Sequence, residues 1–154
     1  MEELNLPVPE VPIQIIEGKK YIFDFIRKKN IVLTPEEWVR QSLLHFLINH
    51  RNYPKSLIKI ESGLIYNTMQ KRSDILIYDR KMNPLILVEC KAPDVKIDQK
   101  VLDQILIYNN KLNSDMLVLS NGVDHFILVH ENDQWRNIDY FPEFEEVVLK
   151  RENK

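Results

Sequence analysis

The sequence has little cysteine, little glycine and no long hydrophobic run, and each shortage excludes a class of protein. The single cysteine, Cys90, excludes an internal disulfide and is typical of the reducing cytoplasm. The three glycines cannot build a phosphate-cradling loop, and no G-x-x-x-x-G-K-[ST] motif is present. No apolar run reaches the roughly 18 residues of a membrane span, and the start MEELNLPVPEVP is unlike a secretory signal. We therefore expect a cytoplasmic protein without a membrane contact.

Charge of either sign is also not in excess. The formal net charge of -2 argues against a protein whose whole surface binds nucleic acid, but it leaves room for a local basic cleft. A length of 154 residues, 44% of them hydrophobic, fits one domain with a sizeable core. Prolines in the first dozen residues predict an extended arm over residues 1–18. We expect a single domain over residues 19–142 and a charged tail over 143–154 with room for a short helix.

Two segments have the pattern of amphipathic helices. The first begins in TPEEWVRQ, where Thr34 is a good N-cap and Glu37 completes a capping box, so we expect a helix over Pro35–His50. The second lies in VKIDQKVLDQILIYNNKLN, where Asp98 is the expected cap. Its apolar stripe consists of Val101, Ile105, Tyr108 and Leu112.

The remaining segments have the pattern of strands. KKYIFDFIRKKNIVL alternates and predicts a strand or hairpin over Lys20–Leu33. LIKIESGLIYN, RSDILIYD and PLILVECK predict three strands between the helices, the first broken near Gly63. After the second helix, DMLVLSNGVDHFILVHENDQWRNIDYF predicts a strand, an Asn-Gly turn and one or two further strands. This order favours an α/β or α+β domain with a mixed central sheet flanked by helices.

RSDILIYD and PLILVECK should form a hairpin whose turn centres near Met82. The facing pairs are then Tyr78 with Leu85, Leu76 with Leu87, and Asp74 with Glu89. Because residues two apart on a strand share a face, Asp74, Glu89 and Lys91 project together at one end. Leu76, Tyr78, Leu85 and Leu87 continue that face, and Ile75, Ile77, Ile86, Val88 and Cys90 form the other. Both faces are apolar, so these strands should be central and covered on both sides.

Two opposed carboxylates at a buried strand end need a compensating charge. Directly opposed side chains have Cβ atoms roughly 4.5–5.5 Å apart, a separation at which two carboxylates repel each other. A divalent cation removes the conflict, and carboxylate oxygens suit Mg²⁺ or Mn²⁺. Lys91 could then orient water or stabilise charge on a phosphate, which predicts phosphodiester hydrolysis. The alternative is a purely structural ion pair of Lys91 with Asp74 or Glu89 at a sheet edge.

These motifs resemble those of the PD-(D/E)XK nucleases. RSD followed after fourteen residues by ECK matches the family's two acidic positions with Asp74 and Glu89, and its lysine with Lys91. DQILIY is similar to the Q-x-x-x-Y motif, with Gln104 and Tyr108, found in the nuclease domain of type I restriction R subunits. TPEEWVRQ is similar to that domain's N-terminal helix. The resemblance covers about residues 33–122.

The resemblance implies a Mg²⁺-dependent endonuclease acting on DNA, with Mn²⁺ as a second cofactor. It implies a restriction-endonuclease-like core in the order α-β-β-β-α-β. Asp74 and Glu89 would bind the metal, and Lys91 would assist catalysis. A serine, Ser73, stands where a proline is common. Because R subunits carry a helicase motor and this sequence has no Walker motif, three readings stay open: a stand-alone nuclease, a subunit of a larger machine, or a fold that binds DNA or protein without cutting.

Further side chains are candidates for supporting roles, each with a plainer alternative. Gln104 and Tyr108 lie one helical turn apart and could lean over the metal site, although Tyr108 also suits the core. Glu37 could bind metal through a water, and the capping box with Thr34 is its alternative; Glu36 is the competing carboxylate.

Basic and polar residues near these motifs are candidates for contact with DNA. Arg72, Arg40 and Gln41 could contact phosphates, since cations dominate affinity for nucleic acid. The alternatives are an exposed strand end for Arg72 and a solvated surface for Arg40 and Gln41. Expected partners besides DNA are a second copy of the chain, or larger motor and specificity subunits.

Overall fold

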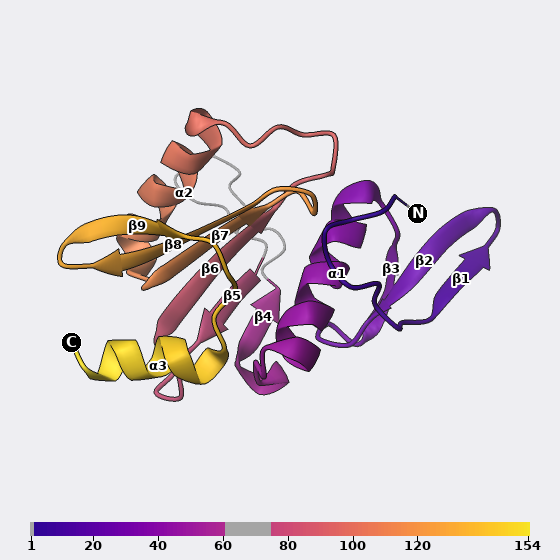
Figure 1. The fold of residues 1–154 in the computed structure, drawn as a ribbon. Helices are drawn as coiled ribbons and strands as arrows, with labels where there is room; N and C mark the ends of the chain where they lie inside the picture. Colours follow the sequence, from indigo (N-terminus) through magenta and orange to yellow (C-terminus); the bar gives the residue numbers. More distant parts are fainter. Residues whose placement is uncertain (1, 61–74) are drawn as a thin grey trace.

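The computed structural model describes residues 2–60 and 75–154, so Gly63, Arg72, Ser73 and Asp74 lie outside the described residues. The elements follow one another as β1 (Ile13–Ile16), β2 (Lys19–Asp24), β3 (Lys29–Val32), α1 (Pro35–His50), the short helix η1 (Lys55–Leu57), β4 (Ile58–Ile60), β5 (Ile75–Tyr78), β6 (Pro84–Cys90), α2 (Gln99–Leu112), β7 (Met116–Ser120), β8 (His125–Glu131), β9 (Gln134–Ile138) and α3 (Phe144–Glu152). Figure 1 shows their arrangement. The order from α1 to β7 is the predicted one.

The central sheet contains six strands in the order β4-β5-β6-β7-β8-β9. Only β6 and β7 run parallel, and every other neighbouring pair is antiparallel. A parallel pair needs a crossover connection, and α2 is that crossover. β6 therefore lies inside the sheet, with paired strands on both sides, and its carboxyl end is held rigidly.

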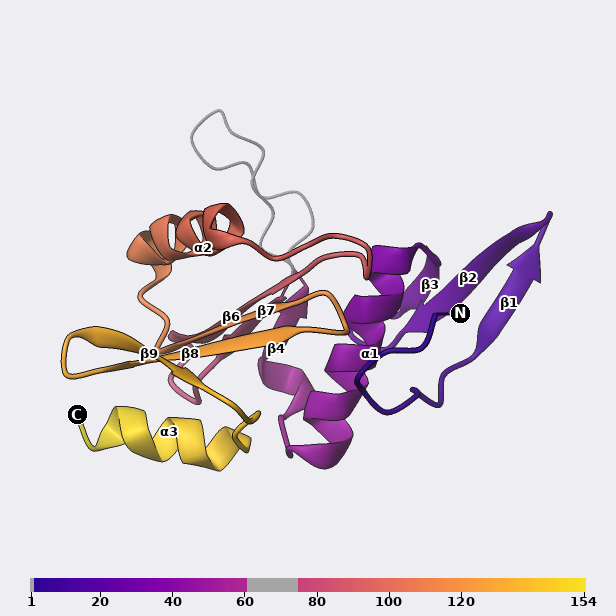
Figure 2. The ribbon, with the colours of Figure 1, turned by 45° about the horizontal axis from the view of Figure 1, so that its top comes forward.

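Helices cover both faces of this sheet, with α1 and α3 on one side and α2 on the other (Figures 1 and 2). Side chains of α1 and α3 pack on one sheet face in a cluster that contains Val39, Leu43, Val88, Cys90 and Phe144. Side chains of α2 pack on the opposite face in a second cluster. The predicted stripe of α2, Val101, Ile105, Tyr108 and Leu112, lies in that second cluster. The domain thus has the predicted mixed sheet between helices.

The predicted pairing of Leu76 with Leu87 is confirmed, but the rest of the hairpin differs. A register shift between Ile77 and Tyr78 places Tyr78 opposite Pro84 instead of Leu85. Leu85 consequently packs on the α1 and α3 side, where we had expected it on the opposite face. The cause is an extra residue in one strand, which reverses the alternation on one side of the shift.

Both major helices begin as their sequences predict. The Thr34 hydroxyl accepts a hydrogen bond from the backbone amide of Glu37 (3.0 Å), and Pro35 follows as the first helical residue. The Asp98 carboxylate accepts one from the amide of Val101 (3.1 Å). These caps fix the starts of α1 and α2, the two helices that carry the supporting candidates.

The N-terminal residues form more than an arm. Residues 13–16, within the predicted arm, are strand β1, which pairs with β2 across a two-residue turn of Glu17 and Gly18. Both turn residues have positive φ angles, 50° and 80°, as a tight hairpin turn requires. Residues 2–6 lie against the body, since the Trp38 indole donates to the Glu2 carbonyl (3.0 Å). The hairpin signal was present in the Glu-Gly pair between two alternating segments.

The C-terminal residues are also structured. Residues 143–154, predicted as a charged tail with room for a short helix, contain α3, and Phe144, Val147 and Val148 of this helix are buried in the core. Within the described ranges, no helix combines the length and the apolar character needed to cross a bilayer.

Candidate active site

Glu89 and Lys91 lie at the carboxyl end of β6, on the sheet face that α2 covers. Leu87 packs against α2 and the neighbours Val88 and Cys90 pack on the opposite side, so alternation directs Glu89 towards the α2 side. The Glu89 side chain is 21% exposed and that of Lys91 30% exposed, and the ammonium lies 3.3 Å from the carboxylate. The strand end thus presents an ion pair that solvent can reach.

Backbone contacts hold this strand end in place. The amide of Lys91 donates to the carbonyl of Ser120 (2.8 Å), which continues the β6–β7 pairing past the end of β6. The side-chain amide of Asn121, which follows β7, donates to the Val95 carbonyl (2.9 Å) in the loop after Lys91. Gly122 forms the predicted Asn-Gly turn with φ +87°, and an added Cβ there would meet Leu4 at 2.7 Å. These contacts therefore hold the end of β6, which carries Glu89 and Lys91, rigidly against β7 and the loop that follows it.

Gln104 and Tyr108 occupy α2, the helix on the same side of the sheet as Glu89. Gln104 is half-buried. Tyr108 is 8% exposed and packs with Leu87 and Ile105 in the cluster beneath α2. The expectation that Tyr108 suits the core is confirmed, and its packing fixes the position of α2 over the strand that carries Glu89.

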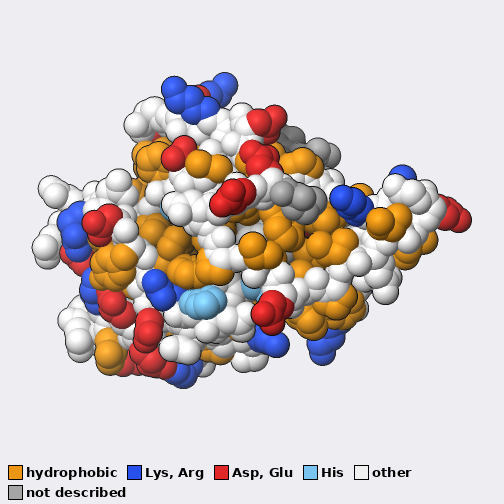
Figure 3. Space-filling model, turned by 45° about the vertical axis from the view of Figure 1, so that its right-hand side comes forward, with side chains coloured by type: hydrophobic (Ala, Val, Ile, Leu, Met, Phe, Trp, Pro, Cys, Tyr) orange, Lys and Arg blue, Asp and Glu red, His pale blue; other side chains and the backbone are white. Residues whose placement is uncertain are grey.

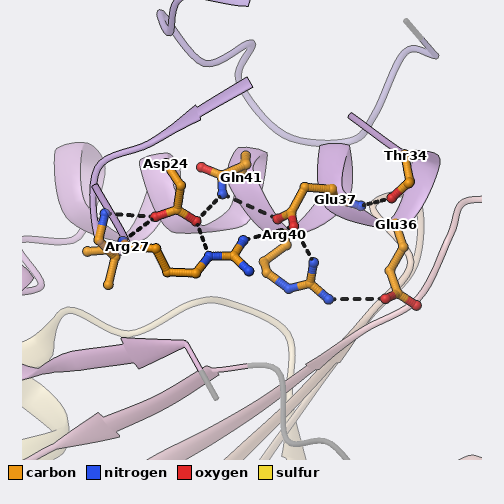
Figure 4. A network of polar contacts seen from close by, with 8 residues as sticks. Asp24, Arg27, Thr34, Glu36, Glu37, Arg40 and Gln41 are labelled. Carbon is orange, nitrogen blue, oxygen red and sulfur yellow. Dashed lines mark hydrogen bonds and ion pairs between the residues drawn. The ribbon is translucent and has the colours of Figure 1, made fainter. Parts of the chain in front are cut away.

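A second polar cluster connects α1 to the β2–β3 hairpin (Figure 4). Asp24 is completely buried, and its carboxylate accepts hydrogen bonds from Arg27 Nε (2.8 Å) and Gln41 Nε2 (2.7 Å). The backbone amides of Ile26 and Arg27 also donate to it. Four donors thus satisfy one buried charge, which is what burial of a carboxylate demands.

Arg27 extends the cluster to Glu37. Its Nη2 lies 2.8 Å from Glu37 Oε1, which also contacts Arg40 Nη1 at 2.9 Å. Gln41 Nε2 reaches the other oxygen, Glu37 Oε2, at 3.3 Å. Arg40 forms a further ion pair with Glu36 (3.0 Å). Glu37 is 4% exposed, and its carboxylate contacts the side chains of Arg27, Arg40 and Gln41. Its backbone amide donates to the Thr34 hydroxyl, which caps α1.

Arg40 and Gln41 are buried, 8% and 1% exposed, and do not form a solvated surface. That alternative was wrong because the β2–β3 hairpin covers this side of α1: its Asp24 accepts from Gln41, and its Arg27 contacts Glu37, the partner of Arg40. Sequence reasoning missed Asp24 and the pairing of Arg27 with Asp24 and Glu37. One signal could have found them: Asp24 shares a strand face with Ile22, so an inward-facing carboxylate required buried donors.

The donor chemistry at the strand end fits a hard divalent cation. Glu89 offers carboxylate oxygens on a rigid strand, within reach of solvent. Asp74, the second predicted ligand, lies outside the described residues. Among residues 2–60 and 75–154, no group of three or more His, Cys, Asp or Glu side chains is arranged to hold a metal ion. Glu89 and Lys91 are thus the described part of the candidate site.

The fold and this strand end define a mixed α/β domain with three helices, a three-stranded antiparallel sheet and a six-stranded mixed sheet. The family described as type I restriction enzyme R protein N terminus (HSDR_N) matches residues 35–142, and the chain belongs to this family. The predicted resemblance to R subunits is thereby confirmed.

A solved structure shares the fold. It is a fragment assigned to the HsdR subunit of a type I restriction enzyme from Vibrio vulnificus YJ016, with a TM-score of 0.58 and 18% sequence identity. The match covers 77% of this chain and 25% of that chain, so the present sequence corresponds to about a quarter of the HsdR fragment. A comparison with curated proteins gave no match.

Proposed function

We propose that this chain is a Mg²⁺-dependent endodeoxyribonuclease with a restriction-endonuclease-like core, and that Mn²⁺ can replace Mg²⁺. The observation that carries the proposal is the pair of Glu89 and Lys91 at the end of an internal strand, in a chain of the R-subunit family. Hydrophobic strands have no packing reason to end in a carboxylate and an ammonium on a helix-covered face. A hydrolytic site has such a reason, because its groups need a rigid mount.

Glu89 and Asp74 would hold the metal ion, and Lys91 would assist catalysis. The bound ion would make a water molecule more acidic and stabilise charge on the phosphate. The Lys91 ammonium, which lies 3.3 Å from Glu89, has three donors for a phosphate oxygen or for the attacking water. Its partner Glu89 fixes where those donors point.

Gln104, Tyr108 and Glu37 would support the site from the two helices. Tyr108 anchors α2 in the core, and Gln104, one turn away, is the candidate for contact with phosphate or water. Glu37, the candidate for binding metal through a water, has both carboxylate oxygens in contact with Arg27, Arg40 and Gln41, so its support would be to hold α1 against the hairpin. Arg72 is the remaining candidate for contact with DNA, because Arg40 and Gln41, proposed from the sequence for the same role, are 8% and 1% exposed and lie in the buried cluster. Because the chain belongs to the R-subunit family of type I restriction enzymes, motor and specificity subunits are proposed partners.

The test is nicking of supercoiled and branched DNA, with RNA in parallel, by the purified protein in Mg²⁺ or Mn²⁺. We expect metal-dependent cutting that falls by about 10²–10³-fold in Lys91→Ala and in Glu89→Gln. Glu145→Gln and Lys150→Ala are matched controls on exposed positions of α3, on the opposite side of the sheet, and should cut normally. Circular dichroism checks that each variant is folded.

Two results would contradict the proposal. Cutting that persists at full rate in Glu89→Gln would remove the site from the mechanism. No cutting on any substrate, together with no Mg²⁺ binding in calorimetry, would favour a module that keeps the fold and binds DNA or protein. Binding of Mg²⁺ that Glu89→Gln abolishes, without cutting, would support the metal site and indicate that a partner subunit is required.

A further inference from the structure

We infer that the outer edge of β1 is a docking surface for a second copy of this chain, which adds to it as an antiparallel strand. This edge belongs to the N-terminal three-stranded sheet, which lies outside the family-matched residues 35–142. The family match therefore assigns it no role. Within the part of the chain that the structure describes, β1 pairs only with β2.

β1 is an exposed edge strand with apolar side chains. Ile13 is 43% exposed, Ile15 69% and Ile16 46%, and every residue of the strand is exposed. The β1–β2 hairpin projects from the body of the molecule in Figures 1 and 2, and some hydrophobic side chains are exposed on this projection in Figure 3. Proteins normally protect such an edge with inward charges, proline or a covering segment, and β1 itself carries neither a charge nor a proline.

The hairpin geometry decides which backbone groups face outward. In a two-residue hairpin the residues that close the turn, here Ile16 and Lys19, form a hydrogen-bonded pair. Hydrogen-bonded pairs recur every second residue, so Gln14 also bonds to β2, and the Phe23 amide bonds to the Pro12 carbonyl (3.2 Å) in the same pattern. The amide and carbonyl groups of Ile13 and Ile15 must therefore point away from β2.

These outward groups match those of a second copy. With Gln14 on the two-fold axis, Ile13 of one copy lies opposite Ile15 of the other, and both pairs exchange backbone hydrogen bonds. On one sheet face the pairing joins Ile13 and Ile15 of both copies into one apolar patch. On the other face the two Gln14 amides meet, each able to donate and accept.

Charge is compatible with this self-pairing. Residues 12–16 oppose one another in this register, and their sequence, Pro-Ile-Gln-Ile-Ile, contains no charge. The charged residues nearest to them are Glu17, in the turn, and Glu10, two residues before Pro12, so both lie outside the paired residues. The edge is short, so we expect weak, reversible association that builds up with concentration rather than a permanent dimer.

Sedimentation equilibrium of the full chain tests the inference, from about 10 µM to about 1 mM as suits a weak interface. The wild-type mass should rise with concentration from 18.4 kDa towards twice that value. The variant Ile13→Lys/Ile15→Lys places like charges at each opposed pair and should weaken association at least about tenfold. Ile13→Glu/Ile15→Glu should do the same alone, and an equimolar mixture of the two variants should associate again.

Ile107→Lys is the matched control, because this residue is 62% exposed on α2, outside the hairpin, and its substitution should leave association unchanged. A wild-type chain that stays monomeric throughout the range would overturn the inference. So would a dimer that the paired lysines do not weaken, or a charge-swapped mixture that stays monomeric. None of these readouts depends on nuclease activity, so this inference and the proposed function can fail separately.

Discussion

A single buried carboxylate, Asp24, determines how the polar side chains of α1 are arranged. It holds Arg27 and Gln41, and Arg27 in turn holds Glu37. Each member has several partners, so removal of one leaves the others with unmet charge or donors in a place that water hardly reaches. The cluster connects residues before the family-matched segment to the first helix within it.

We expect Asp24→Ala to lower the free energy of unfolding by about 3 kcal/mol, since removal of one partner from a buried ionic cluster leaves an uncompensated charge. Urea denaturation followed by circular dichroism measures the change. Asp103→Ala, at an exposed carboxylate of α2 that accepts a hydrogen bond from the Gln99 side chain, is the control and should change stability by less than about 0.5 kcal/mol. Equal effects of the two substitutions would contradict the prediction.

At the scale of elements, α3 shows how a charged segment can belong to the core. Its sequence is dominated by Glu, Lys and Arg, yet Phe144 is 1% exposed and packs edge-on against Tyr53 with ring centroids 5.6 Å apart. The Tyr53 hydroxyl donates to the Pro142 carbonyl (2.9 Å), just before the helix. The helix is therefore anchored at its first residue, while its charged face points to solvent.

Phe144→Ala should lower the free energy of unfolding by about 3–5 kcal/mol, because it leaves a cavity beneath the sheet. Leu149→Ala, at a residue of the same helix that is 53% exposed, should cost less than about 1 kcal/mol. Thermal and urea unfolding measure both. A Phe144→Ala protein as stable as the wild type would show that residues 143–154 contribute little to the core.

At the scale of the whole molecule, ion pairs join α3 to the central sheet. Arg151 of α3 contacts Asp79, after β5, at 3.1 Å and Asp115, before β7, at 2.9 Å. Burial of Asp79 opposes its ionisation, but hydrogen bonds from the Asn83 amide, from Arg151 and from the Lys81 amide outweigh it and hold the pKa of Asp79 below its ordinary 3.8. Folding therefore favours the ionised form of this group.

A carboxyl whose pKa is lower in the folded state makes the free energy of unfolding fall as the solution becomes more acidic. The contribution of ionised Asp79 is complete above its unfolded pKa of 3.8 and is lost as pH falls through the lower pKa of the folded state. We expect Asp79→Asn to be less stable than the wild type by about 1–2 kcal/mol at pH 7, since the amide keeps an acceptor but loses the ion pair. The difference should shrink below pH 3.8 in urea titrations across pH. A difference that stays constant down to pH 2 would contradict this assignment.

The sequence by itself determined α1 and α2, their caps, the order of elements from α1 to β7 and the two faces of β6 from Ile86 to Cys90, because these depend on local periodicity and on side chains within one turn of a helix end. Thr34, Asp98 and the alternation from Leu87 to Lys91 are examples. The tertiary structure alone decided which face Leu85 occupies, because one shifted residue reverses alternation. It also decided that Arg40 and Gln41 are buried, because a separate hairpin supplies Asp24, the partner of Gln41, and Arg27, which contacts Glu37 beside Arg40. Contacts between segments distant in sequence leave no periodic signal, and the buried charge cluster around Asp24 consists of such contacts.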